Sequence, residues 1–175
     1  MRIIVSVGLP GSGKGIVSDA ARSIGIRVVS MGDTVRRYHE HSGEGMAVGE
    51  FADSERSKYG KAVWAERVME DVDDEIVLVD GCRSIDELDV LRTYGHVYII
   101  SVHTLSKNRY ERLVSRARED SPKSINEFDE RDRREIRYGT SKLMEVADYV
   151  INNDGRPELS QVEAERILHS IIDEV

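Results

Sequence analysis

The sequence has a single cysteine, Cys82, and no apolar run that approaches the roughly 18 residues needed to cross a bilayer. One cysteine cannot form a disulfide within the chain, which fits a reducing compartment. The chain also lacks the charged leader and apolar segment of a secretory signal, because an apolar strand begins almost at once. Together these absences predict a cytoplasmic protein without a membrane partner.

Positive charge is scarce relative to negative charge. The chain carries 25 Lys and Arg against 33 Asp and Glu, so its formal net charge is −8. This balance opposes nonspecific binding to nucleic acid, although a local basic cleft is compatible with it. With 175 residues, 39% of them apolar, we expect one globular domain, spanning 1–175, with a sizeable core and a small-molecule ligand rather than a nucleic acid.

Strand and helix patterns alternate along the chain. Short apolar runs predict strands, and they lie at residues 2–7, 27–30, 76–79, 97–102 and 147–151. We expect helices after each of the first four strands, mostly polar ones at 106–146 after the fourth, and a last amphipathic helix covers 159–172. This order predicts an α/β fold of the P-loop NTPase type, a five-stranded parallel sheet flanked by helices. We expect a helical insert at about 31–72 and a polar helical lid at about 105–140.

The stretch Gly8-Leu9-Pro10-Gly11-Ser12-Gly13-Lys14-Gly15 joins the first strand to the first helix. A glycine-rich turn in this setting exposes backbone N–H groups to phosphate, and the helix N-terminus adds partial positive charge. We expect nucleotide contacts from Gly8, Gly11, Ser12, Gly13, Lys14, Gly15 and Ile16. Lys14 would bridge the β- and γ-phosphates. The residue after the lysine is Gly15, where the strict pattern has a magnesium-binding Ser or Thr.

Asp80 ends the apolar run at 76–79. Ligands of open parallel sheets gather outside the carboxyl ends of the strands, so a carboxylate there can hold magnesium directly or through water. We therefore expect Asp80, together with Asp33, to serve a magnesium ion. The plainer interpretation of Asp80 is a helix cap after the strand.

Asp33, Arg36 and Arg83 follow two predicted strands and so belong at the same edge of the sheet. We expect the two arginines to grip an acceptor phosphate and Asp33 to orient the acceptor or magnesium. The alternative for Asp33 and Arg36 is an ordinary ion pair within one helical turn.

Residues 105–138 are rich in arginine interleaved with acidic residues, which is typical of a solvated helical face. The arginines closest after the fourth strand are those we expect to close over the transferring phosphate. We assign Arg112 and Arg118 to the substrate and Arg116 to catalysis, beside Lys14 and Asp33.

These motifs resemble a known group. The loop at 8–15 is similar to the adenylate kinase form of the P-loop, in which Gly follows Lys. Residues 30–36 resemble the nucleoside monophosphate segment of that family, and Asp80-Gly81-Cys82-Arg83 resembles its Asp, Gly and Arg, with one residue missing. Residues 112–116 and 147–155 resemble the end of dephospho-coenzyme A kinases. The chain also looks like the small adenylate-kinase-related proteins of archaea.

The resemblance implies an ATP- and magnesium-dependent kinase that phosphorylates a nucleotide, most simply a nucleoside monophosphate such as AMP. One alternative is a dephospho-coenzyme A kinase, in which Asp33 would act as base toward a ribose hydroxyl. Another is a nucleotide-binding ATPase or switch without an acceptor. In adenylate kinases a threonine follows the Lys-Gly pair, where this sequence has Ile16, and a threonine is usual where Met31 stands.

Overall fold

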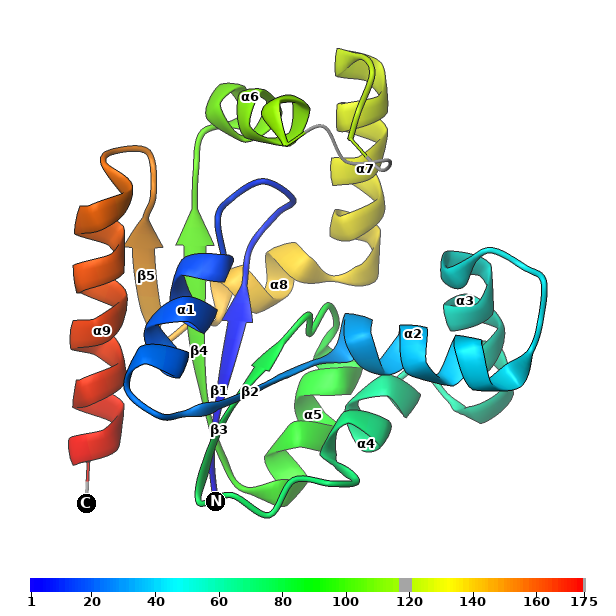
Figure 1. Cartoon of the computed structure of the whole chain (residues 1–175), viewed down its shortest axis with the longest axis horizontal. Helices are drawn as coiled ribbons and strands as arrows, with labels where there is room; N and C mark the ends of the chain where they lie inside the picture. Colours follow the sequence, from blue (N-terminus) through cyan, green and yellow to red (C-terminus); the bar gives the residue numbers. More distant parts are fainter. Residues whose placement is uncertain (117–120, 175) are drawn as a thin grey trace.

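The computed structural model describes residues 1–116 and 121–174. Within them, five parallel strands form one sheet in the order β2-β3-β1-β4-β5 (Figure 1). The strands are β1 (Arg2–Val7), β2 (Arg27–Ser30), β3 (Ile76–Asp80), β4 (His96–His103) and β5 (Tyr149–Asn152). The chain thus starts in the middle of the sheet, and the loop after β1 emerges between the ends of β3 and β4.

Side chains of β1 alternate between two separate cores. Ile3, Val5 and Val7 pack on one face of the sheet, and Ile4 packs on the other. Successive strand residues point to opposite faces, and a parallel sheet covered on both sides therefore needs apolar residues throughout its central strands. The helices α1 (Gly15–Ser23) and α9 (Pro157–Asp173) cover the Ile4 face, as Figure 1 shows.

The other face is covered by α4 (Val63–Met69), α5 (Ile85–Tyr94) and α8 (Thr140–Glu145). Leu88 and Leu91 of α5 are fully buried, which confirms the inner face that their spacing indicates. Trp64 is also fully buried, and its indole N–H donates to the Ala52 carbonyl at 3.2 Å. That bond ties α4 to α3 (Val48–Tyr59).

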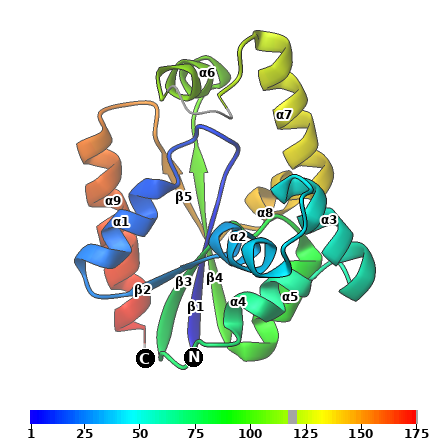
Figure 2. The same cartoon turned by 45° about the vertical axis from the view of Figure 1, so that its right-hand side comes forward.

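The insert begins with α2 (Met31–Ser42), directly after β2. Ser30 caps it, because its hydroxyl accepts the Asp33 N–H at 3.2 Å, and Gly43 ends it at φ +68°. The insert projects sideways from the sheet. By contrast, α6 (Ser106–Ser115) and α7 (Ile125–Tyr138) stand over the carboxyl ends of the strands (Figure 2).

The last strand begins two residues later than its sequence pattern predicts. Ala147 and Asp148 precede β5, and Asp148 bonds to the sheet in a different way. Its N–H donates to the Ile99 carbonyl at 2.9 Å, and its carboxylate accepts the Ile99 N–H at 2.8 Å. The Asp148 carboxylate therefore accepts a hydrogen bond from β4 at a position where the sequence pattern predicts a backbone carbonyl of the last strand. In the described part of the chain, no helix is long and apolar enough to cross a membrane.

Core packing should dominate stability. We expect Leu88→Ala to lower the free energy of unfolding by about 2–5 kcal/mol, because a fully buried leucine leaves a cavity. Val162→Ala, at a side chain that is 62% exposed, is the control and should change it by less than about 0.5 kcal/mol. Urea denaturation measures both, and equal losses would contradict the assignment of this core.

Candidate active site

The loop after β1 wraps tightly against the protein behind it. Gly11 and Gly13 have φ of +81° and +91°, a region that favours glycine. A Cβ at Gly13 would lie 2.2 Å from Asn153 Nδ2, and one at Gly11 would lie 2.7 Å from the Arg109 carbonyl oxygen. These glycines are therefore required by the packing behind the loop as well as by the approach of a ligand in front.

Several N–H groups of this loop have no hydrogen-bond partner in residues 1–116 and 121–174, among them those of Gly11, Gly13, Lys14 and Gly15. The Ser12 N–H is different, because it donates to the Leu9 carbonyl at 3.0 Å and closes the turn. Unpaired N–H groups at the start of a helix are donors of the kind that bind anions.

Lys14 places its ammonium inside the loop. Its Nζ donates to the Gly8 carbonyl at 2.7 Å. Loss of surrounding water lowers the pKa of Lys14, while the negative charges of Asp80 and Glu135 oppose that shift. A partly desolvated cation of this kind is suited to an anionic ligand such as phosphate.

A cavity of about 330 Å³ lies in front of the loop. It brings Lys14 together with Arg36, Asp80, Arg83 and Arg116, which come from four different segments of the chain. The sequence predicted each of these residues for the site. Their convergence on one cavity is what β1, β2 and β3 produce by ending at the same edge of the sheet.

Asp33 does not line this cavity. Its carboxylate is paired with the Arg36 guanidinium one helical turn later, and both side chains are exposed. The ion pair that the spacing allowed is therefore present. Arg36 nevertheless reaches the cavity as well, so the pair does not withdraw it from the site.

Arg112 and Arg116 separate to opposite sides of the loop. Arg112 lies behind it, where its guanidinium donates to the carbonyls of Ser12 at 3.3 Å and Asn153 at 2.6 Å. It is therefore not brought together with Arg36 and Arg83. Arg116 is exposed and lines the cavity. Arg118 lies outside the described residues.

Asp80 suits magnesium held mainly by water and phosphate. Its Oδ1 accepts the Ser6 hydroxyl at 3.2 Å, an interaction that holds the carboxylate at the junction of β1 and β3. Magnesium in nucleotide sites needs only one or two carboxylates besides phosphate oxygens and water. The described residues contain no group of three or more His, Cys, Asp or Glu side chains arranged to hold a metal. A nucleotide-borne magnesium fits this donor set, whereas a metal held by protein groups alone does not.

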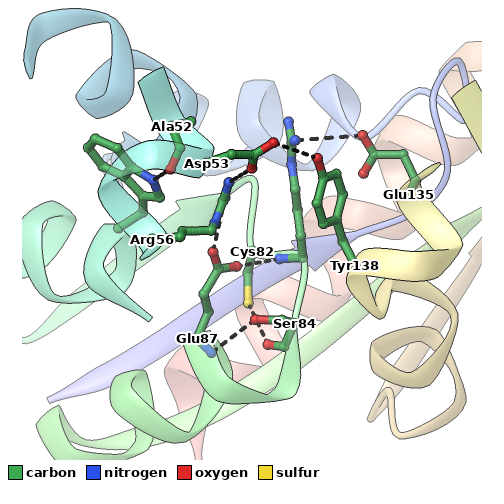
Figure 3. Close-up of polar contacts among 10 residues, drawn as sticks. Ala52, Asp53, Arg56, Cys82, Ser84, Glu87, Glu135 and Tyr138 are labelled. Atoms are coloured by element: carbon green, nitrogen blue, oxygen red, sulfur yellow. Dashed lines mark hydrogen bonds and ion pairs between the residues drawn. The ribbon is translucent and has the colours of Figure 1, made fainter. Parts of the chain in front are cut away.

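Glu87, which Figure 3 shows beside Arg56, also binds the backbone of Arg83. Glu87 is 1% exposed, its Oε2 accepts the Arg83 N–H at 2.7 Å, and its Oε1 lies 3.5 Å from Arg56 Nη2. Burial raises the pKa of Glu87, although the neighbouring arginines oppose the shift. On the other side, the Arg83 guanidinium lies 3.7 Å from the Glu135 carboxylate of α7.

Sequence reasoning missed Glu87 and Arg56. A glutamate in the first turn of a helix normally faces water, so its sequence position suggested no site role. One signal was available, since Ser84 and Glu87 have the spacing of a capping box. The Ser84 hydroxyl does accept the Glu87 N–H at 3.2 Å. The Glu87 carboxylate, however, accepts the N–H of Arg83 and not that of Ser84, which a capping box would require.

Cys82 lines the cavity but is buried, and its Sγ points to the Ser84 carbonyl at 3.7 Å. Burial strongly raises the pKa of this thiol, so it stays protonated. It is a packing residue of the site rather than a nucleophile.

The fold agrees with the comparisons to known proteins. A family profile described as an AAA domain matches residues 7–129. The UPF0200 protein of Sulfurisphaera tokodaii is 36% identical over 174 residues, with 98% of each chain covered. This chain belongs to the UPF0200 family. A UPF0200 protein of Hyperthermus butylicus is 38% identical over 172 residues, covering 95% of this chain and 92% of that one.

Solved structures extend the likeness of this UPF0200 member to kinases. TT1252 from Thermus thermophilus superposes with a TM-score of 0.67 at 20% identity, covering 100% of this chain and 97% of that one. Shikimate kinase from Acinetobacter baumannii, solved with shikimate, gives 0.60 at 17% identity and covers 98% and 92%. At these identities the likeness concerns the fold. The predicted fold, a five-stranded parallel sheet of the P-loop kinase type, is confirmed.

The lowered pKa of Lys14 gives a pH prediction. Because the ammonium loses its proton below the usual range of lysine, ATP affinity should fall as the pH rises from 7.5 to 10. Calorimetric titration of ATP into the wild type and Lys14→Arg measures this. The guanidinium stays charged throughout, so the variant should bind more weakly at pH 7.5 but show a flat profile. Parallel profiles in the two proteins would refute this role of Lys14.

Proposed function

We propose that this protein is an ATP-dependent phosphotransferase whose acceptor is a nucleoside monophosphate such as AMP. One observation carries the proposal. Arg36 and Arg83 share a single cavity with the phosphate-loop lysine, while Asp33 lies outside it. Two guanidinium groups suit an acceptor that arrives with its own phosphate. A kinase acting on a neutral hydroxyl has less need of them.

On the donor side, the open N–H groups of the loop would hold the β- and γ-phosphates of ATP. Lys14 would neutralise the charge that develops on the transferring group. Magnesium, when bound, supplies further neutralisation, and Asp80 would hold it through its coordinated water. Ser12 and Ile16 belong to the same segment, Ser12 in the turn and Ile16 in the first turn of α1.

On the acceptor side, a smaller pocket of about 140 Å³ adjoins the cavity. The pocket is lined by the apolar side chains of Met31, Val35 and Trp64. Arg36, Arg56 and Arg83 line it as well. Apolar and cationic side chains in one pocket suit a flat base or ribose with an attached phosphate. The acceptor phosphate would take the place of Glu135 next to Arg83, because both are anions within reach of one guanidinium.

The transfer itself would be direct and in line. The acceptor phosphate oxygen attacks the γ-phosphorus of ATP, the bond to the β-phosphate oxygen breaks, and ADP leaves. Positioning and charge neutralisation supply the acceleration, with no covalent enzyme intermediate. Arg116, exposed at the end of α6, would close on the transferring phosphoryl group when α6 and α7 act as a lid and exclude water.

A hydroxyl acceptor such as dephospho-coenzyme A is the second candidate. It is favoured by the fold shared with shikimate kinase, whose solved complex holds a ligand that is not a nucleotide. In that case Asp33 would turn from Arg36 and take the hydroxyl proton. A switch that only hydrolyses ATP is less well supported, because it has no use for the second cationic group at Arg36 and Arg83. We place the reaction in the cytoplasm, with small molecules as its only partners.

An acceptor panel tests the proposal. We expect transfer of γ-phosphate from Mg-ATP to AMP or another nucleoside monophosphate at a rate at least tenfold above that to dephospho-coenzyme A or water. Lys14→Ala is the control, and it should lose nearly all transfer while its melting temperature stays near that of the wild type. Transfer to none of the monophosphates by a protein that does bind ATP would overturn the acceptor assignment.

A pair of variants separates the two acceptor chemistries. For a phosphate acceptor, Arg83→Gln should raise the acceptor KM by about 10–100-fold, since a charge-assisted bond is lost. Asp33→Asn should leave kcat within about threefold. For a hydroxyl acceptor the order reverses, because loss of the base lowers kcat by about 100-fold or more at unchanged acceptor affinity. Steady-state kinetics at saturating ATP measures both variants.

A further inference from the structure

The carbonyl groups at the back of the phosphate loop are held by buried and half-buried donors that the transfer chemistry does not use. The Ser12 carbonyl accepts from Asn153 Nδ2 at 2.8 Å, from Thr104 Oγ1 at 2.9 Å and from Arg112 Nη1 at 3.3 Å. Asn153 follows β5 and Thr104 follows β4, so both extend from the strand ends beside the loop. Three side chains from outside the loop thus converge on one of its oxygens.

A second carbonyl of the loop is held in the same way. The Pro10 oxygen accepts from Arg109 Nη1 at 3.0 Å, and Arg109 is 3% exposed. Its guanidinium also binds the Asp132 carboxylate of α7, at 2.8 and 2.5 Å. Arg109 was one of the arginines that the sequence assigns to a solvated helical face, and the structure instead buries it against the loop.

Holding these two oxygens fixes two N–H groups. The peptide unit is planar and trans, so the C=O of one residue and the N–H of the next point in opposite directions. An anchored Ser12 carbonyl therefore directs the Gly13 N–H away from Asn153, and an anchored Pro10 carbonyl directs the Gly11 N–H away from Arg109. The N–H groups of Gly11 and Gly13 are among those of the loop that have no hydrogen-bond partner among the described residues.

Such an anchor is needed because the loop is rich in glycine. Glycine adopts many backbone conformations at similar energy, so a peptide unit flanked by glycine can rotate and turn its carbonyl toward the phosphate. A carbonyl oxygen facing phosphate repels it. Donors that favour one orientation remove this cost before the ligand arrives, which is preorganisation.

We propose that Asn153, Thr104, Arg112 and Arg109 are positioning residues for the donor phosphates, acting through the Ser12 and Pro10 carbonyls. The inference rests on the proposed use of ATP but not on any particular acceptor. Stability alone gives Asn153 little reason to be polar. Its Oδ1 is buried without a partner in the described chain, and the Ser12 oxygen retains two other donors when Nδ2 is removed.

The test compares two ligands, ATP and inorganic tripolyphosphate, by calorimetric titration. We expect Thr104→Val and Asn153→Leu each to weaken both ligands by up to about tenfold, and the double variant to weaken both further, by equal factors for the two ligands. Tripolyphosphate has no base or ribose. Equal factors therefore locate the effect at the phosphates, whereas weakening of ATP alone would show direct contact with the nucleoside and overturn the proposal.

Two controls separate positioning from general damage. Thr104→Ser restores the hydroxyl and should recover wild-type affinity. Ser101→Ala removes a fully buried hydroxyl of β4 that has no partner among the described residues, and it should leave both affinities unchanged. Unaltered affinities in the double variant would overturn the inference while leaving the proposed function standing. A wild type that binds neither ligand would overturn both.

Discussion

The parallel pairing of β1 with β3 on one side and β4 on the other is the constraint on which this site depends. The register sets Ser6 beside Asp80 and Val7 beside Ser101. The loop after β1 therefore emerges with a carboxylate on one flank and the donors that follow β4 and β5 on the other. A glycine-rich loop has little conformational preference of its own. Its shape is given by the strand ends around it.

These strand ends bring cationic and anionic side chains together at the cavity. The chain as a whole is acidic, but Lys14, Arg36, Arg83 and Arg116 converge in front of the loop. A local cluster of cations suits an anionic ligand even in a chain whose net charge is negative.

Local patterns predicted what depends on local chemistry. The five strands, the phosphate loop and the residues after β2 and β3 follow from apolar runs, glycine spacing and the rule that ligands gather at the carboxyl ends of strands. Local patterns could not predict which arginines line the cavity and which lie behind the loop. Arg112 and Arg116 are one helical turn apart, yet one turns behind the loop and the other toward the cavity. The difference depends on where Ser12 and Asn153 lie in the folded chain. Sequence patterns near the arginines do not give those positions.

Glu87, the buried glutamate that accepts the Arg83 N–H, is a second feature that local sequence patterns could not predict. Glu87 is costly to bury, and the cost is offset only because it accepts the Arg83 N–H and faces Arg56. Its position ties the loop after β3 to α3 of the insert, while Arg83 itself faces Glu135 of α7. Arg83 is thus the point where the sheet, the insert and the α7 segment meet. An anion that replaces Glu135 there would release α7 from one of its contacts.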